Sequence, residues 1–176
     1  DIYKAKFKES KNKTLTFKDL SAKYTSKDKV IISNGEPITR LKIFNKLKEA
    51  SIGLGILIDP SAIISPYCQI GEGSIVGPFC HVSSYSNIGT NVLINTKTIV
   101  GHDVRIKENS VISSMVNIGG KTMIDENVFV GMGSLIKENI RIKHNSIISM
   151  GSVVYKDVEP ELIVMGNPAR PIKRNI

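Results

Sequence analysis

The chain has 176 residues, enough for one or two domains, and a formal net charge of +8. It has no Trp, few aromatic residues and no known nucleic-acid-binding motif, and no apolar run approaches the roughly 18 residues of a membrane span, so neither nucleic acid nor membrane insertion is expected. Much of the lysine lies in the first thirty residues. These lysines either form an ordinary solvated surface or attract anionic ligands such as phosphates.

Residues 1–57 are expected to form a small α/β domain. Strands are predicted at 14–17, 29–33 and 52–57, and helices at 19–24 and 38–50. Pro37 precedes the longer helix, as is common at the first helical position. Strand, helix and strand within thirty residues indicate a βαβ unit. This piece is small for an independent core, so we expect it to pack on the rest of the chain or on a neighbouring subunit.

Residues 58–158 carry a six-residue repeat. Seventeen consecutive positions at this spacing, from Ile58 to Val154, are all Ile or Val. A period of six fits neither a lone helix nor a lone strand, and it predicts a parallel β-helix in which three units close one triangular coil of eighteen residues. The fold class is therefore mainly β, with the branched aliphatic residues pointing inward.

The position two residues before each of these aliphatics is small or β-branched and should fill the rest of a narrow interior. Both cysteines, Cys68 and Cys80, occupy this slot. They are twelve residues apart and should lie on different faces, so we expect reduced core thiols in a reducing compartment. After residue 158, a C-terminal tail of residues 159–176 ends basic.

Three segments make a resemblance specific: Gly101-His102-Asp103, Ile118-Gly119-Gly120 and Gly166-Asn167-Pro168-Ala169-Arg170. With the repeat, they resemble hexapeptide-repeat acyltransferases of the sialic acid O-acetyltransferase type, which include bacterial nucleotide-sugar N-acetyltransferases. The resemblance implies a left-handed β-helix, a Rossmann-like N-terminal domain, a homotrimer and acetyl-CoA bound between subunits. Nothing before Asp19 matches the family's strand and glycine-rich loop, so either the chain is truncated or the acceptor is held differently.

The repeat places His102 at a corner, where side chains point outward, so a core histidine is not expected there. The resemblance implies that His102 is the general base and that Asp103 raises its basicity; the alternatives are a solvated histidine and an ordinary turn aspartate. Gly120 lies eighteen residues after His102, so it should stack on the same corner. Its backbone N–H is expected to stabilise an oxyanion, unless it is a plain turn glycine.

The remaining site residues rest on the resemblance alone. It implies that acetyl-CoA contacts Gly120, Met132, Met150, Arg170 and Lys173. Asn95 and Ser113 match positions near the base, although corner turn-formers would look the same. The Asn34-Gly35 turn corresponds to part of the family's nucleotide-sugar loop.

The predicted activity is acetyl transfer from acetyl-CoA to an amino group of a nucleotide-linked sugar in bacterial surface-glycan synthesis. We expect direct transfer, a homotrimer, a cytoplasmic location and no metal, because the three histidines occupy different columns of the repeat. The alternatives are O-acetylation of sialic acid or another hydroxyl, a serine-type acceptor, or a non-catalytic scaffold or carbohydrate-binding trimer.

Overall fold

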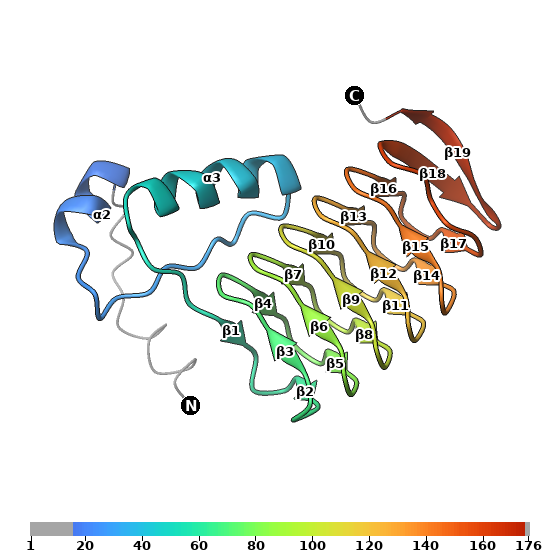
Figure 1. Ribbon diagram of the computed structural model, residues 1–176, viewed down its shortest axis with the longest axis horizontal. Helices are drawn as coiled ribbons and strands as arrows, with labels where there is room; N and C mark the ends of the chain where they lie inside the picture. Colours follow the sequence, from blue (N-terminus) through green and yellow to red (C-terminus); the bar gives the residue numbers. More distant parts are fainter. Residues whose placement is uncertain (1–15, 175–176) are drawn as a thin grey trace.

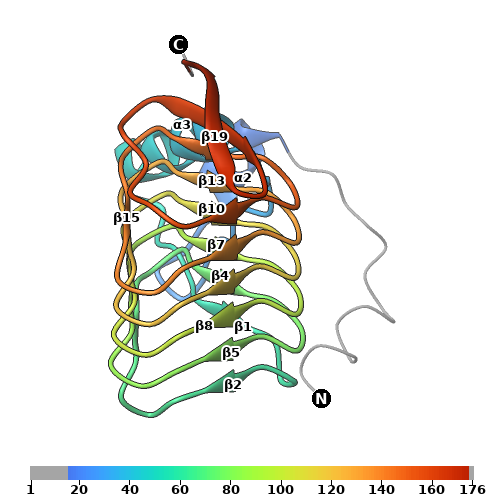
Figure 2. The same ribbon diagram turned by 90° about the vertical axis from the view of Figure 1, so that its right-hand side faces the viewer.

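The structure is a computed structural model, and it describes residues 16–174. Most of the chain winds into a left-handed parallel β-helix of about six turns, with two helices at its N-terminal end and a hairpin at its C-terminal end (Figure 1). Turned by 90°, the same ribbon shows successive coils lying one above another (Figure 2). The predicted β-helix is therefore confirmed.

Short strands form three sheets, one on each face of the coil. The eight-stranded sheet comprises β1 (Leu57–Ile58), β4 (Ile75–Val76), β7 (Leu93–Ile94), β10 (Val111–Ile112), β13 (Phe129–Val130), β16 (Ile147–Ile148), β18 (Leu162–Gly166) and β19 (Ala169–Arg174). The six-stranded sheet comprises β2 (Ile63–Ile64), β5 (His81–Val82), β8 (Ile99–Val100), β11 (Asn117–Ile118), β14 (Leu135–Ile136) and β17 (Val153–Val154). The five-stranded sheet comprises β3 (Gln69–Ile70), β6 (Asn87–Ile88), β9 (Arg105–Ile106), β12 (Met123–Ile124) and β15 (Arg141–Ile142).

Parallel pairing joins each strand to the one eighteen residues later. Val76 pairs with Ile94, for example, and Ile94 with Ile112. The second residue of each short strand points inward, and from Val76 to Val154 these side chains are buried. The first coil has no coil beneath it, and Ile58 is accordingly exposed. Three six-residue units therefore close one coil, as the repeat predicts.

Small polar residues complete the interior without leaving unpaired groups. The hydroxyls of Ser74, Ser86 and Thr98 each donate to a carbonyl fifteen residues later, at 2.8 to 2.9 Å. A buried hydroxyl without such a partner would be costly. Cys68 and Cys80 are free thiols that precede β3 and β5 on different sheets, as expected. Burial raises the pKa of the Cys80 thiol, which keeps it protonated and unreactive.

The corners between faces share one backbone conformation. Every sixth residue from Gly73 to Gly151 has a positive φ, a conformation that Asn, Asp and Gly tolerate best. We name the corners by their residues: the histidine corner joins the six- and five-stranded sheets at His102, and the methionine corner joins the eight- and six-stranded sheets at Met132. The asparagine corner joins the five- and eight-stranded sheets at Asn91, Asn109, Asn127 and Asn145.

Two helices precede the β-helix. α2 (Phe17–Lys23) begins at a capping box between Thr16 and Asp19, which starts it two residues earlier than predicted. α3 (Pro37–Glu49) agrees with the predicted helix and lies along the eight-stranded face (Figure 1).

The expected Rossmann-like domain is not present among the described residues. The predicted strands at 29–33 and 52–57 are reduced to one parallel bridge between Val30 and Leu54, and the first residues of β1 take up the end of the second. The predicted strand at 14–17 is also wrong where it is described, because Thr16 and Phe17 start α2; Thr14 and Leu15 lie outside the described residues. The apolar residues of this segment, among them Ile32 and Ile52, instead form a small core with Leu47 of α3, which is too small to support a sheet of its own.

The β18–β19 hairpin closes the C-terminal end of the stack. It pairs through β18 with β16 in parallel and folds back antiparallel as β19. Neither helix of the described chain is long and apolar enough to cross a membrane.

Candidate active site

The histidine corner presents an exposed imidazole held by a carboxylate. His102 and Asp103 follow β8, and Asp103 has a φ of 57°, which Asp tolerates. His102 Nδ1 lies 2.7 Å from Asp103 Oδ2, and the two side chains are 61% and 48% exposed. A carboxylate accepts hydrogen bonds, so in the neutral imidazole this contact places the proton on Nδ1 and leaves the lone pair on Nε2. The geometry therefore leaves a basic nitrogen facing outward.

Gly120 lies directly over this imidazole, one coil further on. Lys121 N donates to His102 O at 2.8 Å, which fixes the stacking of the two corners. A Cβ at position 120 would lie 2.6 Å from His102 Nε2, so any other residue there would force the imidazole to move. Glycine at this position thus allows the ring to lie against the next coil. The predicted stacking of Gly120 on His102 is confirmed.

The Gly120 amide remains available to a ligand. The ladder bonds around it are made by Gly119 N to Ile136 O and by Lys121 N to His102 O, at 2.8 Å each. The Gly120 N–H has no hydrogen-bond acceptor within residues 16–174. A free backbone N–H can donate a hydrogen bond to a developing oxyanion while the neighbouring histidine takes a proton. His102, Asp103 and Gly120 therefore form one constellation.

Other predicted residues lie at the methionine corner. Met132 and Met150 occupy successive coils there and are exposed. Asn95 and Ser113 lie at the same corner; Asn95 Oδ1 accepts from Thr96 N at 2.8 Å, as a corner turn-former does. Within one chain, the full width of the six-stranded face separates this corner from His102.

The Asn34-Gly35 turn lies on the eight-stranded face. Gly35 approaches Leu93 of β7, and the Asn34 side chain accepts from Glu36 N at 2.8 Å. The histidine corner is the vertex opposite this face of the triangular coil. Within one chain, the predicted acceptor loop and the predicted base therefore cannot meet.

A cavity of about 500 Å³ also lies on this face, beside the start of α3. Its lining is mostly apolar and includes Ile38, Phe129 and Ile147. The Glu36 carboxylate caps α3 by accepting from Ile38 N and Thr39 N, at 2.9 and 2.7 Å. Because that carboxylate already occupies the helix N-terminus, an anion is not favoured there.

Two of the predicted acetyl-CoA contacts, Arg170 and Lys173, lie at the C-terminal end. Arg170 and Lys173 are in β19 and exposed, and Arg170 borders a cavity of about 430 Å³ that Lys156 also lines. They are several coils from His102, a separation that suits only an extended ligand.

Sequence reasoning missed how α3 is attached. Arg40 is fully buried and donates to Asn34 O, Asn91 O and Asn91 Oδ1, at 2.7 to 3.1 Å, and also to Ile32 O. Burial lowers the pKa of its guanidinium to about 10. From Asn91, side-chain amides bond along the asparagine corner to Asn109, Asn127 and Asn145. The eighteen-residue spacing of these asparagines is a signal that the sequence contains.

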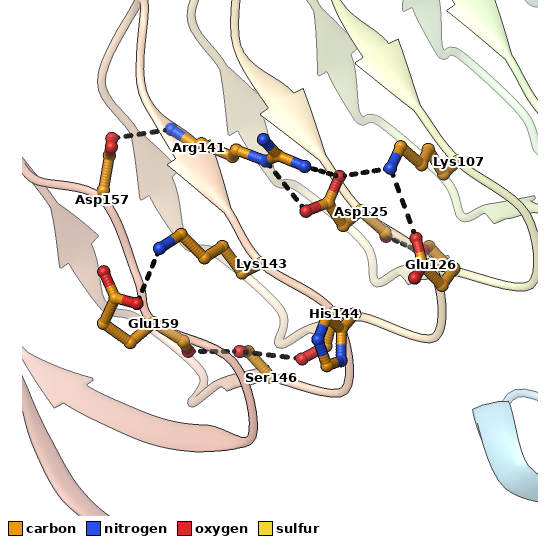
Figure 3. A network of polar contacts seen from close by, with 10 residues as sticks. Lys107, Asp125, Glu126, Arg141, Lys143, His144, Ser146, Asp157 and Glu159 are labelled. Carbon is orange, nitrogen blue, oxygen red and sulfur yellow. Dashed lines mark hydrogen bonds and ion pairs between the residues drawn. The ribbon is translucent and has the colours of Figure 1, made fainter.

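A second missed network crosses the five-stranded face (Figure 3). Asp125 is buried and accepts from Lys107 Nζ at 2.8 Å and from Arg141 Nε at 2.9 Å. Burial alone would raise the pKa of Asp125, but the hydrogen bonds from Arg141 and Lys107 outweigh it and lower that pKa. Lys143 pairs with Glu159 at 2.6 Å in the same view. These contacts join successive coils and serve stability.

No group of three or more His, Cys, Asp or Glu side chains in residues 16–174 is placed to hold a metal ion. The residues around His102 instead suit an organic acyl donor, because an exposed base and a free amide adjoin each other.

Comparison with known proteins gives matches in structure only. No protein-family model and no curated protein matches the sequence. Among solved structures, a variant of GDP-perosamine N-acetyltransferase from Caulobacter crescentus, in complex with CoA and GDP-perosamine, is 26% identical with a TM-score of 0.81, over 83% of this chain and 70% of that one.

Two further structures are similar. The acetyltransferase domain of PglB from Neisseria gonorrhoeae, in complex with acetyl coenzyme A, is 27% identical with a TM-score of 0.83, over 87% of this chain and 75% of that domain. WeeI from Acinetobacter baumannii is 27% identical with a TM-score of 0.85, over 90% of this chain and 77% of that one. In structure, the chain is thus similar to the hexapeptide-repeat, CoA-dependent nucleotide-sugar N-acetyltransferases, which confirms the resemblance expected from its sequence.

Proposed function

We propose that this protein transfers acetyl from acetyl-CoA to an amino group of a nucleotide-linked sugar, with His102 as general base. The observation that carries the proposal is the histidine corner, where Asp103 holds Nδ1, Nε2 lies against Gly120, and the Gly120 N–H has no acceptor among the described residues. The structural neighbours that bind CoA and GDP-perosamine support this choice of donor and acceptor.

The proposed reaction is a direct transfer. The acceptor nitrogen attacks the thioester carbonyl, and His102 Nε2 removes the proton that the nitrogen loses. The Gly120 N–H donates to the oxyanion of the tetrahedral intermediate. The carbon–sulfur bond then breaks and the departing thiolate takes the proton from the imidazolium. No acyl-enzyme is needed, and both cysteines, Cys68 and Cys80, pack in or against the core of the β-helix.

The arrangement also favours an assembly with a shared site. The acceptor loop at Asn34-Gly35 and the base at His102 lie on opposite sides of the same coil. If both act on one substrate, the loop must come from a neighbouring subunit. This argument supports a homotrimer in which each site combines the histidine corner of one subunit with the acceptor loop of the next.

In such an assembly, the acetyl-CoA site would include residues of more than one corner. Met132 and Met150 offer exposed, flexible thioethers for the pantetheine arm, and Arg170 and Lys173 offer charge for its phosphates. Asn95 and Ser113 would lie along the same groove. We place the reaction in the cytoplasm, where acetyl-CoA and nucleotide sugars are available.

The proposal is tested by release of free thiol from acetyl-CoA in the presence of an acceptor panel. The panel contains nucleotide-linked 4-amino sugars, other nucleotide-linked amino sugars, sialic acid and serine, beside a reaction without acceptor. Rapid release with one amino sugar, and an N-acetylated product by mass spectrometry, is expected. Release only with sialic acid would establish O-acetylation instead. Folded, oligomeric protein that releases no thiol with any acceptor would refute the proposal.

A further inference from the structure

Two stacked tyrosines stand beside the proposed base. Tyr67 and Tyr85 are 64% and 65% exposed, and their ring centroids lie 5.5 Å apart with an interplanar angle of 26°. They occupy the histidine corner in the column that continues to Asp103, each eighteen residues from the next. Nothing in the β-helix core requires them, because they point away from it.

Their position relative to His102 is fixed by the backbone. Asp103 N donates to Ser84 O at 3.0 Å, so Tyr85 lies one coil below Asp103. Adjacent coils are spaced by about 4.8 Å. The tyrosines are on the N-terminal side of His102, whereas Gly120 is on its C-terminal side. Ser84 lies directly below His102, and the aromatic surface of Tyr85 lies in the neighbouring column, below Asp103.

Tyr85 also adopts a backbone conformation that bulky residues disfavour. Its φ is 62°, in a position that Asn fills at five other corners. Phe79, Lys97 and Met115 share this conformation, so it belongs to the corners of the repeat and allows Asn to replace Tyr85. The stack with Tyr67 restrains the Tyr85 ring, so little side-chain entropy remains to be lost on binding.

We infer that the open surface of the Tyr67–Tyr85 pair binds the pyranose ring of the acceptor sugar. The inference rests on the proposed function and names the part of the substrate that this corner recognises. The C–H face of a pyranose is apolar and slightly electropositive, which complements the negative face of an aromatic ring. A ring seated there directs its amino substituent toward His102 Nε2.

Distance selects the sugar over the nucleobase. The attacking nitrogen is bonded directly to the pyranose, so that ring must lie close to the base, and Tyr85 is only one coil away, below Asp103. The nucleobase is separated from the sugar by a ribose and two phosphates and reaches well beyond one coil. The thioester meets the nitrogen from the other side, at Gly120. Both substrates then approach His102 from opposite coils, as direct transfer requires.

The test compares Tyr85→Asn with Phe79→Asn. Phe79 is an equally exposed aromatic residue with a φ of 57°, but it lies at the methionine corner and has no part in the proposed subsite. Asn already occupies this corner conformation at Asn91 and Asn109, so both variants should fold. Loss of an aromatic stacking surface should lower kcat/KM for the nucleotide-linked amino sugar by about ten- to a hundredfold, with KM for acetyl-CoA unchanged. Phe79→Asn should match the wild type.

Calorimetry separates this inference from the proposed function, because it needs no turnover. Tyr85→Asn should weaken binding of the nucleotide-linked amino sugar by the same factor, and leave binding of the free nucleoside diphosphate unchanged. Equal weakening of both ligands would mean that the nucleobase occupies the tyrosines, and would overturn the inference. A changed sedimentation profile for Tyr85→Asn would make the pair a subunit contact, with the same consequence. Sugar binding that depends on Tyr85 without any acetyl transfer would refute the proposed function alone.

Discussion

Replacing Arg40 tests how the predicted acceptor loop is held. Arg40 is buried between α3 and the asparagine corner, and its guanidinium donates to Ile32 O, Asn34 O, Asn91 O and Asn91 Oδ1. Arg40→Met keeps most of the side-chain length and removes every one of these donors. The loop that begins at Asn34 and the helix that follows it then lose their polar connection to the β-helix.

The size of the effect follows from two opposing contributions. Hydrogen bonds to a charged group contribute about 1.5 kcal/mol each at the lower end, so four total about 6 kcal/mol. Burial of the charge opposes this, and the lowering of the Arg40 pKa to about 10 corresponds to about 3 kcal/mol. The variant should therefore weaken the docking of α3 by about 3 kcal/mol.

Hydrogen exchange measured by mass spectrometry reports this docking directly. Amides of α3 should exchange about a hundredfold faster in Arg40→Met, while β-helix amides such as those of β10 keep their protection. Lys42→Met is the matched control, because Lys42 is an exposed cation on the same helix. Unchanged protection of α3 in Arg40→Met would refute the assigned role of Arg40.

Three further outcomes are expected. Gly120→Ala should displace the imidazole, because its Cβ would lie 2.6 Å from His102 Nε2, and activity should fall about a hundredfold at an unchanged melting temperature; full activity would contradict the contact. Asp103→Asn tolerates the positive φ but removes the charged partner of His102, so kcat should fall about 10- to 100-fold, and an unchanged kcat and pH profile would exclude Asp103 from positioning the base. The pKa of Asp125 is lower in the folded protein than its ordinary value of 3.8, so the stability that its carboxylate contributes is present above that value and is lost as the pH falls further. The free energy of urea unfolding between pH 2.5 and 6 should therefore depend less on pH in Asp125→Asn. An equal pH dependence in the two proteins would exclude the ion pair with Arg141.

The β-helix could be predicted from sequence because each six-residue unit carries the same residue types at the same positions. Every inward position from Ile58 to Val154 is Ile or Val, and a corner recurs after each. A strict period also fixes which residues stack, so Gly120 could be placed over His102 before any coordinates were known. The same arithmetic would have found the Tyr67–Tyr85 pair.

The N-terminal segment could not be predicted in the same way. Lys29 to Ser33 and Ile52 to Leu57 have strand-like composition, yet only Val30 and Leu54 pair. Strand propensity describes a half-buried pleated surface, and here Ile32 and Ile52 are buried against Leu47 of α3 without further strand pairing. Arg40 decides this arrangement, and no local pattern marks a single arginine as buried. The pairing of Asp125 with Arg141 likewise joins residues sixteen apart, outside the period.

The separation of the predicted site residues between two corners and the eight-stranded face is also a property of the fold rather than of any motif. His102 and Asn34 are each recognisable in the sequence, but only the triangular coil shows that they face opposite ways. A motif reports which residues are present, whereas the assembly determines which of them meet.

The most direct test of the central claim is acceptor-dependent thiol release by His102→Ala. His144→Ala is the matched control, since His144 lies at the asparagine corner, away from Gly120. General-base catalysis contributes about 10²- to 10⁴-fold, so His102→Ala should lose that much in kcat while still binding acetyl-CoA, and His144→Ala should retain the wild-type rate. A His102→Ala variant that turns over at nearly the wild-type rate would contradict the assignment of His102 as the base.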